Sequence, residues 1–169
     1  MSVRFYAVPL RALEEAGVRY VTVGGVAVIL HGYGRLTGDV DIFVALEQEN
    51  AMKAISALTA LGLRPKAPVD PTDFADENIR NRWRDEKGMM VFSMIDPARP
   101  FFSVDIFVED IIPFDELMHR SQVIETEDGP IRVCSYEDLI DLKLQAGRPQ
   151  DLADVHELKA IHEARNAED

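Results

Sequence analysis

Apolar residues in the first half of the chain recur at two spacings, and each spacing predicts a different kind of element. Spacings of three and four residues are typical of an amphipathic helix, and here they lead up to Gly17 and Gly62, which are common helix ends. Short runs rich in β-branched residues predict buried strands. The sequence therefore predicts a helix up to residue 16, a strand at Tyr20–Val23, a short buried helix at 26–31, a strand at 39–45 and a helix at 49–61.

The second half predicts strands first and helices last. Alternating prolines and aspartates in residues 65–77 predict a loop, and two strands are expected at 89–94 and 103–108. A turn at 127–130 predicts a hairpin of strands 122–125 and 131–134. Ser135 and Asp138 resemble a capping box for a helix that ends near Ala146, and Pro149 suits the first turn of a last helix. This order predicts an α/β (α+β) fold with a mixed β-sheet.

Charge and cysteine content narrow the function classes. The net charge is −12, and residues 66–169 carry all of the excess, because residues 1–65 hold six acids and six bases. Bulk DNA binding is not expected, since phosphate recognition needs clustered Lys and Arg. The single cysteine, Cys134, excludes an internal disulfide framework and favours a cytoplasmic location. No apolar run is long enough to span a membrane or to serve as a signal peptide.

A five-residue repeat is the most informative feature. The run Val-Asp-Ile-Phe-Val occurs at 40–44 and again at 104–108. In strands, side chains alternate between faces, so the Val and Ile side chains share one face, and Asp39, Asp41 and Asp105 share the other. Clustered carboxylates repel each other unless a cation compensates, and Mg²⁺ or Mn²⁺ prefers such oxygen ligands. The sequence therefore predicts a metal site formed by Asp39, Asp41 and Asp105.

The segment before the first aspartates predicts a phosphate site. A strand ends at Gly24 and Gly25, a helix follows, and thirteen residues separate Gly25 from Asp39. Glycines let the backbone approach a ligand closely, and the amides of a helix N-terminus favour phosphate. Phosphate and metal would then meet at one place.

Together these motifs resemble the nucleotidyltransferase superfamily with the DNA polymerase beta-like fold, and most closely its AbiEii-like and minimal nucleotidyltransferase branch. Gly24-Gly25, Asp39, Asp41 and Asp105 occupy its hallmark positions. The run 35–41, Arg-x-Thr-x-Asp-x-Asp, resembles the AbiEii-like and lincosamide-modifying branches, and the tail 143–154 resembles the AbiEii-like pattern of Lys, Arg and Asp-x-x-Asp. Two positions depart from the pattern: Gln150 replaces a common basic residue, and Gly25 replaces a common serine.

The resemblance implies a mixed sheet with helices packed on one face and a C-terminal helical pair. We expect one domain over residues 1–169, with a catalytic core at about 18–110 and the C-terminal hairpin and helices at about 111–165. The implied reaction is metal-dependent transfer of a nucleoside monophosphate from an NTP to a hydroxyl acceptor, with release of pyrophosphate. Asp39, Asp41 and Asp105 would be catalytic and metal-binding, and the nucleotide-binding candidates are Gly24, Gly25, His31, Arg35, Thr37, Lys143 and Arg148.

Several alternatives stay open. The candidate acceptors are a small molecule, an RNA and a protein. In one version of the hypothesis, the enzyme is a toxin that acts with an antitoxin partner. Other versions are a catalytically silent interaction module of antitoxin type and a metal-dependent phosphohydrolase. His31 also fits a packed histidine, and Lys143 and Arg148 also fit a salt-bridged helix pair. Arg80, Arg82 and Arg84 with Trp83 fit either base stacking or a solvated charged segment.

Overall fold

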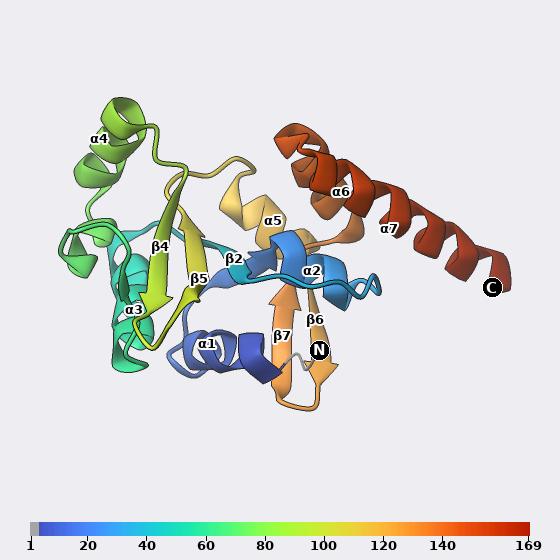
Figure 1. Ribbon diagram of the computed structural model, residues 1–169, viewed down its shortest axis with the longest axis horizontal. Helices are drawn as coiled ribbons and strands as arrows, with labels where there is room; N and C mark the ends of the chain where they lie inside the picture. The colour runs from blue at the N-terminus through green and yellow to red at the C-terminus, as the bar shows by residue number, and fades with distance from the viewer. Residues whose placement is uncertain (1–3) are drawn as a thin grey trace.

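The computed structural model describes residues 4–169 and contains one seven-stranded mixed sheet with helices around it (Figure 1). The order of the strands across the sheet is β3-β4-β5-β2-β1-β7-β6. The elements in chain order are α1 (Arg4–Glu15), β1 (Tyr20–Val23), α2 (Gly24–Leu30), β2 (Asp39–Val44), α3 (Gln48–Ala60), β3 (Arg64–Pro65), the 3₁₀ turn η1 (Pro71–Ala75), α4 (Glu77–Lys87), β4 (Val91–Asp96), β5 (Arg99–Phe107), α5 (Phe114–Arg120), β6 (Gln122–Thr126), β7 (Gly129–Val133), α6 (Tyr136–Ala146) and α7 (Pro149–Glu168).

The two copies of the repeat form adjacent strands in the centre of the sheet. β2 runs parallel to β5 and antiparallel to β1, and Asp41 is the register partner of Asp105. The predicted alternation is confirmed, because the valine and isoleucine side chains of both copies are buried on one face of the sheet. On the opposite face, the rings of Phe43 and Phe107 stack with their centroids 4.1 Å apart. The repeat therefore places two rows of carboxylates side by side.

Helices cover the two faces of the sheet unequally. One face packs against α1, α3, η1 and α4, and this core includes Leu10, Leu58 and Phe92. On the other face, α2, α5, α6 and α7 pack over β1, β2 and β7. The half of the sheet made by β3, β4 and β5 therefore has helices on one face only, as expected, whereas the central strands are covered on both sides. The predicted mixed α/β fold with a C-terminal helical pair is confirmed.

The structure corrects the expectation for residues 65–77 and adds two helices. Residues 71–75 form a 3₁₀ turn, and α4 begins at Glu77, where the Asp76 side chain accepts hydrogen bonds from the first turn. Few apolar positions mark α4, so helical spacing did not reveal it. Trp83 points inward and stacks on Phe92, with 5.2 Å between the ring centroids. The sequence also did not predict the short helix α5.

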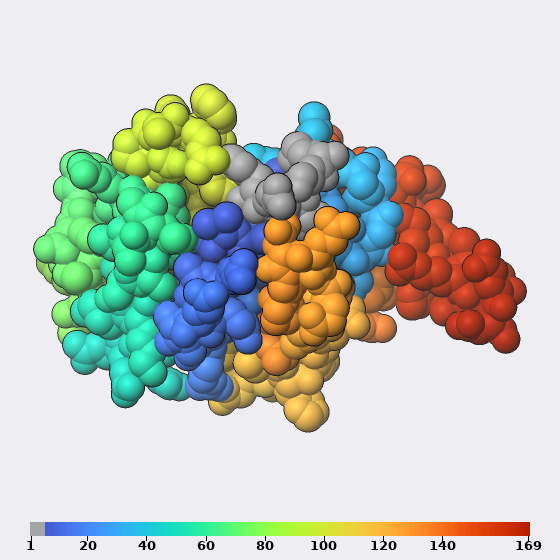
Figure 2. Space-filling view, turned by 90° about the horizontal axis from the view of Figure 1, so that it is seen from below, coloured from blue at the N-terminus to red at the C-terminus, as the bar shows by residue number. Residues whose placement is uncertain are grey.

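Helices α6 and α7 pack against each other at one end of the molecule, and the C-terminal part of α7 extends beyond the body of the protein (Figure 2). Ser135 caps α6 by accepting a hydrogen bond from the amide of Asp138, as the capping-box pattern predicts. Cys134 is buried, and burial raises the pKa of its thiol to about 12, which makes it a poor nucleophile. Within residues 4–169 no helix is long and apolar enough to cross a membrane.

Two methionines near the start of β4 test the burial of this strand. Met94 is fully buried in the core, whereas Met90 is half exposed. Met94→Ala is expected to lower the free energy of unfolding by roughly 2–5 kcal/mol, because it leaves a cavity. Met90→Ala, the matched control, is expected to change it by less than about 0.5 kcal/mol. Urea denaturation followed by circular dichroism measures both, and equal effects would contradict the core described above.

Candidate active site

The three predicted carboxylates lie together on one face of the sheet. Asp41 stands next to Asp105 across the parallel pair of strands, and Asp39 stands next to Ser103. The Ser103 hydroxyl lies 2.8 Å from Asp39 Oδ1 and 2.9 Å from Asp105 Oδ1, so it can donate to either carboxylate. The serine therefore links the two strands through their acidic side chains.

The carboxylates perturb each other electrostatically. Burial raises the pKa of Asp41 to about 7, the charges of Asp105 and Asp39 add to the rise, and the cations of Lys143 and Arg148 oppose it. Burial also raises the pKa of Asp105, although hydrogen bonds from Ser93 and Ser103 act in the other direction. Two neighbouring acids with raised pKa values are typical of a site that takes up a proton or a cation.

Gly24 and Gly25 are glycines because the site leaves no room for side chains. Gly24 has a φ of 66°, and a Cβ there would overlap the carboxylate of Asp41. A Cβ at Gly25 would lie 2.6 Å from the Thr37 hydroxyl oxygen and 3.2 Å from Arg35 Nη2. The Thr37 hydroxyl therefore takes up the space where a side chain of residue 25 would begin. The backbone of the β1–α2 junction is held directly beside the carboxylates.

A buried charge cluster joins the loop before β2 to the C-terminal helices. Asp154 is fully buried, with Arg35 Nε 2.7 Å from its Oδ1 and Lys143 Nζ 2.9 Å from its Oδ2. Gln150 donates a further hydrogen bond of 2.9 Å to Oδ1. Burial alone would raise the pKa of Asp154, but these partners hold it below its ordinary value. Asp154 is therefore an ionised anchor between α7, α6 and the segment that leads into β2.

Asp151 anchors the second half of this cluster. Its carboxylate lies 3.1 Å from Lys143 Nζ and accepts a 2.7 Å hydrogen bond from Arg148 Nε. The Arg148 side chain nevertheless remains 75% exposed, and its charge influences Asp41. The salt-bridged helix pair considered as an alternative is therefore present. It also holds Arg148, the most exposed cation of the cluster, beside the carboxylates.

Two residues that the sequence offers as candidate ligand contacts, His31 and Trp83, are buried within the fold. His31 is buried and its Nε2 lies 2.8 Å from the carbonyl oxygen of Cys134, so this nitrogen is used within the fold. The base-stacking interpretation of the arginine cluster is wrong for Trp83, which is buried. Arg80 donates to the carbonyl oxygens of Phe74 and Leu46, which fixes it in the interior.

Sequence reasoning gave no role to Ser93, Ser103 or Lys66, which surround Asp105. Ser93 is the register partner of Asp105 on β4, and the amide of Lys66 donates to the Ser93 carbonyl oxygen over 2.9 Å. Ser103 could have been noticed from the sequence, because it precedes Asp105 by two residues on the same strand face. Lys66 comes from a segment with no recognisable pattern.

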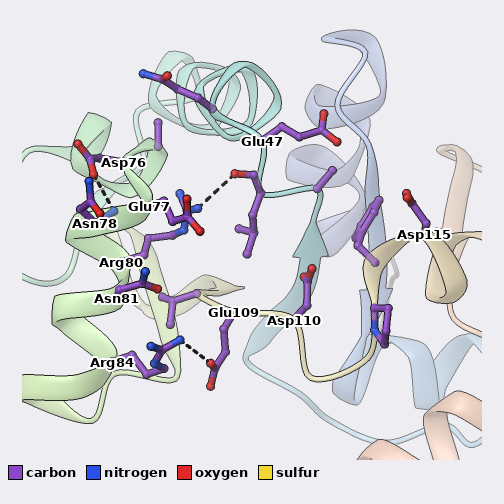
Figure 3. A pocket seen from close by; sticks show the side chains of 17 residues that line it. Glu47, Asp76, Glu77, Asn78, Arg80, Asn81, Arg84, Glu109, Asp110 and Asp115 are labelled. Carbon is purple, nitrogen blue, oxygen red and sulfur yellow. Dashed lines mark hydrogen bonds and ion pairs between the residues drawn. The ribbon is translucent and has the colours of Figure 1, made fainter.

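A cavity of about 850 Å³ lies away from these carboxylates, between α4 and the segment that joins β5 to α5 (Figure 3). It opens beyond the ends of β2 and β5, whereas Asp39 stands at the start of β2. Its lining is rich in acids, and its two arginines are already engaged, Arg84 with Glu109 over 2.9 Å and Arg80 with backbone carbonyls. None of the residues predicted for the active site lines it.

The carboxylates have the chemistry of a divalent-cation site, although they do not form a closed one. Within residues 4–169, no three His, Cys, Asp or Glu side chains converge closely enough to hold an ion as they stand. The donors are all oxygen atoms, and the raised pKa of Asp41 shows that its negative charge is poorly compensated. A hard cation such as Mg²⁺ or Mn²⁺ would supply the missing compensation.

The mixed sheet, with a Gly-Gly junction beside carboxylates on two adjacent parallel strands, is the arrangement that the resemblance to nucleotidyltransferases implies. The chain belongs to the family described as nucleotidyl transferase AbiEii toxin, type IV toxin–antitoxin system, whose model matches residues 11–169. The protein is therefore a nucleotidyltransferase of the AbiEii family. No curated protein matches the sequence.

Solved structures share the fold at low sequence identity. The lincosamide antibiotic adenylyltransferase LnuA, bound to lincomycin, is 19% identical, with a TM-score of 0.59 over 94% of this chain and 95% of its own. ANT(2″)-Ia in complex with adenylyl-2″-tobramycin is 18% identical, with a TM-score of 0.56 and coverage of 98% and 95%. A nucleotidyltransferase-like protein from Paracoccidioides brasiliensis is 13% identical, with a TM-score of 0.53 and coverage of 92% and 73%.

The raised pKa of Asp41 predicts a pH dependence of stability. The folded-state pKa of about 7 exceeds the ordinary value of 3.8, so ionisation of Asp41 destabilises the folded state. Without divalent metal, the free energy of unfolding of the wild type relative to Asp41→Asn is expected to fall as the pH rises from about 4 to about 7. Urea denaturation in EDTA at a series of pH values measures this difference, and a difference independent of pH would refute the prediction.

The anchoring role of Asp154 predicts a large loss of stability when it is truncated. Asp154→Ala leaves the cations of Arg35 and Lys143 without this carboxylate in a largely buried setting. The expected loss is roughly 3–5 kcal/mol of unfolding free energy. Asp141→Ala, an exposed aspartate on α6, is the matched control and is expected to cost less than about 0.5 kcal/mol. Thermal and urea denaturation distinguish the two variants.

Proposed function

We propose that the protein transfers a nucleoside monophosphate from an NTP to a hydroxyl acceptor and releases pyrophosphate, with Mg²⁺ or Mn²⁺ bound. The observation that carries the proposal is the register of β2 and β5, which sets Asp41 beside Asp105 and Asp39 beside Ser103. This carboxylate row adjoins both the glycine junction and the cations of α6 and α7. Metal, triphosphate and acceptor can therefore meet at one place.

Asp39, Asp41 and Asp105 would hold the metal. The chemistry that a bound divalent ion would supply there is neutralisation of the triphosphate charge, which would favour attack at the α-phosphorus. The protein's own residues contribute mainly by position. Gly24 and Gly25 would offer backbone amides to the triphosphate, and the Thr37 hydroxyl lies against Gly25. The triphosphate would contact these groups and the exposed guanidinium of Arg148.

Arg35 and Lys143 would act from a more buried position. Both bind Asp154, and Lys143 also binds Asp151, so each cation is held in place before substrate arrives. Such pre-organisation reduces the cost of ordering charges during the reaction. The positive charge of Lys143 acts on Asp41 through space. His31, bound to the Cys134 carbonyl, would contribute to the shape of the site from the end of α2.

The chemical step is a displacement at phosphorus. The acceptor oxygen forms a bond to the α-phosphorus, the bond from the α-phosphorus to the bridging oxygen of the β-phosphate breaks, and pyrophosphate leaves with that oxygen. The acceptor proton passes to Asp105, whose raised pKa brings it closer to neutral pH and makes it a better base than an ordinary carboxylate. Positioning and charge neutralisation supply most of the rate enhancement.

The fold relatives suggest what the acceptor class includes. One was solved with lincomycin and another with adenylylated tobramycin, which are small molecules. The family description instead names toxins of a type IV toxin–antitoxin system. We propose that this chain acts as such a toxin with a cognate antitoxin, and growth arrest on expression, abolished by Asp41→Asn, would support that role.

The experiment is a labelling assay with each α-labelled NTP, Mg²⁺ or Mn²⁺, total RNA and cell extract. Asp41→Asn and Asp105→Asn are expected to lower transfer by about 100-fold or more, because each removes a charge that would hold the metal and stabilise the transition state. Asp141→Asn, with the same chemical change on an exposed part of α6, is expected to retain full activity.

The destination of the label distinguishes the remaining alternatives. Label on RNA, protein or a small molecule supports transfer and identifies the acceptor. Label released only as nucleoside monophosphate would instead show a phosphohydrolase. Equal labelling by wild type and both active-site variants would refute the proposed site, and no metal-dependent NTP binding at all would favour the silent interaction module.

A further inference from the structure

The sheet face that carries Asp105 continues beyond the carboxylates without a helix over it. On β4, Ser93 and Ile95 share this face, because they are the register partners of Asp105 and Ser103. On the edge strand, Arg64 is the register partner of Ile95. In Figure 1 no helix passes in front of β4 and β5. Side chains from three strands therefore form an open surface that starts at Asp105.

An exposed aromatic ring stands at one end of this surface. Phe101 is 82% exposed, whereas its neighbour Phe102 is buried and lies 5.8 Å from the Tyr6 ring, centroid to centroid. The alternation of β5 sets Phe101 on the same side as Ser103 and Asp105, opposite to Phe102. Only nine large hydrophobic residues are exposed within the described chain, and Phe101 is the most exposed of them. An uncovered ring two residues before Ser103, on the same face as Asp105, can stack on a flat ring of a ligand.

Two cations stand along the outer edge of the surface, level with Ser103 and Asp105. Arg64 and Lys66 are exposed, and within residues 4–169 neither has a carboxylate at ion-pair distance. By contrast, the cations nearest the other side of the carboxylates are engaged, as Arg35 and Lys143 are with Asp154. In a chain with a net charge of −12, unpaired cations beside an active site attract an anion.

We propose that Phe101, Arg64 and Lys66 form the acceptor subsite, and that the acceptor carries a flat ring and an anionic group beside its hydroxyl, which is the chemistry of a nucleotide unit. This inference rests on the proposed function and adds the class of acceptor to it. The ring stacks on Phe101, the anionic group lies near Arg64 and Lys66, and the hydroxyl faces Asp105, which takes its proton. A cationic acceptor would be repelled by the same two side chains.

Edge-strand cations also protect a sheet against pairing with another chain. That role predicts that charge reversal at Arg64 or Lys66 changes solubility, and it makes no prediction about Phe101. A joint effect of the ring and the cations on one ligand therefore separates the acceptor subsite from protection of the edge.

The test measures binding of an acceptor probe in the absence of NTP. The probes are a short fluorescein-labelled single-stranded RNA of random sequence, followed by anisotropy, and the four unlabelled nucleoside monophosphates as competitors. Phe101→Ala is expected to weaken binding roughly ten-fold, because each stacked base contributes strongly, and Phe101→Trp is expected to restore it. Lys66→Glu is expected to weaken binding and to reduce its salt dependence.

Arg82→Glu and Val8→Ala are the matched controls, since both residues are exposed and lie on helices that cover the opposite face. Binding of RNA that monophosphates do not displace identifies a nucleic-acid end as the acceptor, whereas displacement by monophosphates identifies a free nucleotide. No binding of either probe, or binding that Phe101→Ala leaves unchanged, overturns the proposal.

Metal-dependent NTP binding, measured separately, is expected to be unchanged in Phe101→Ala. If the wild type binds no NTP but binds the RNA through Phe101, the proposed reaction fails while the subsite stands. If the wild type transfers label but Phe101→Ala has no effect on probe binding, the subsite fails while the reaction stands. The two proposals can therefore fail independently.

Discussion

The parallel pairing of β2 with β5 forces two carboxylates together, and the rest of the site compensates for that contact. Asp41 and Asp105 stand side by side because the opposite faces of both strands are buried in the main core. Each fully buried Val or Ile contributes roughly 1.5–3 kcal/mol, so the aliphatic residues of the two copies together contribute on the order of 10 kcal/mol. Burial, together with repulsion from Asp105 and Asp39, raises the pKa of Asp41 from 3.8 to about 7, and a shift of this size costs only a few kcal/mol. The residues that hold this pairing in place are Val40, Ile42, Val44, Val104 and Ile106.

The C-terminal helices contribute to the candidate active site from a distance in sequence. Arg35 reaches Asp154 across 119 residues, and Lys143 reaches the same carboxylate from α6. One buried anion therefore sets the position of two cations and ties the α2–β2 loop to α7. Without this anchor, Arg35 and Lys143 would be free to pair with Asp39 or Asp41, the carboxylates proposed to bind the metal. The cluster thus keeps both cations near Asp39 and Asp41 while they remain bound to Asp154.

Local periodicity in the sequence predicted the strands and which face each of their side chains occupies. It did not predict contacts between segments that are distant in the sequence. The alternation in 40–44 and 104–108 assigned the correct faces, because a strand allows only two. No periodic signal marked α4, whose inward positions are held by Trp83 and Arg80 among charged neighbours. Lys66 and Ser93 came near Asp105 only through pairing of β3 with β4 and of β4 with β5. Tertiary contacts of this kind leave no trace in a single sequence, whereas the Gly-Gly and Asp-x-Asp motifs are local and were readable.

The net charge acts differently at long and short range, and this difference bears on the acceptor. Exposed charges are screened beyond a Debye length of about 10 Å, so the field near Asp105 depends mostly on its close neighbours. There the exposed cations Arg64 and Lys66 line the sheet edge and the charge of Lys66 acts on Asp105, whereas much of the acidic excess lies elsewhere, including the cavity near α4. A long polyanion would meet repulsion over most of the protein surface. In the proposed reaction a single nucleotide unit, or only the end of a nucleic acid, would reach the short basic edge near Asp105, so the acidic surface would favour a terminal hydroxyl as the acceptor.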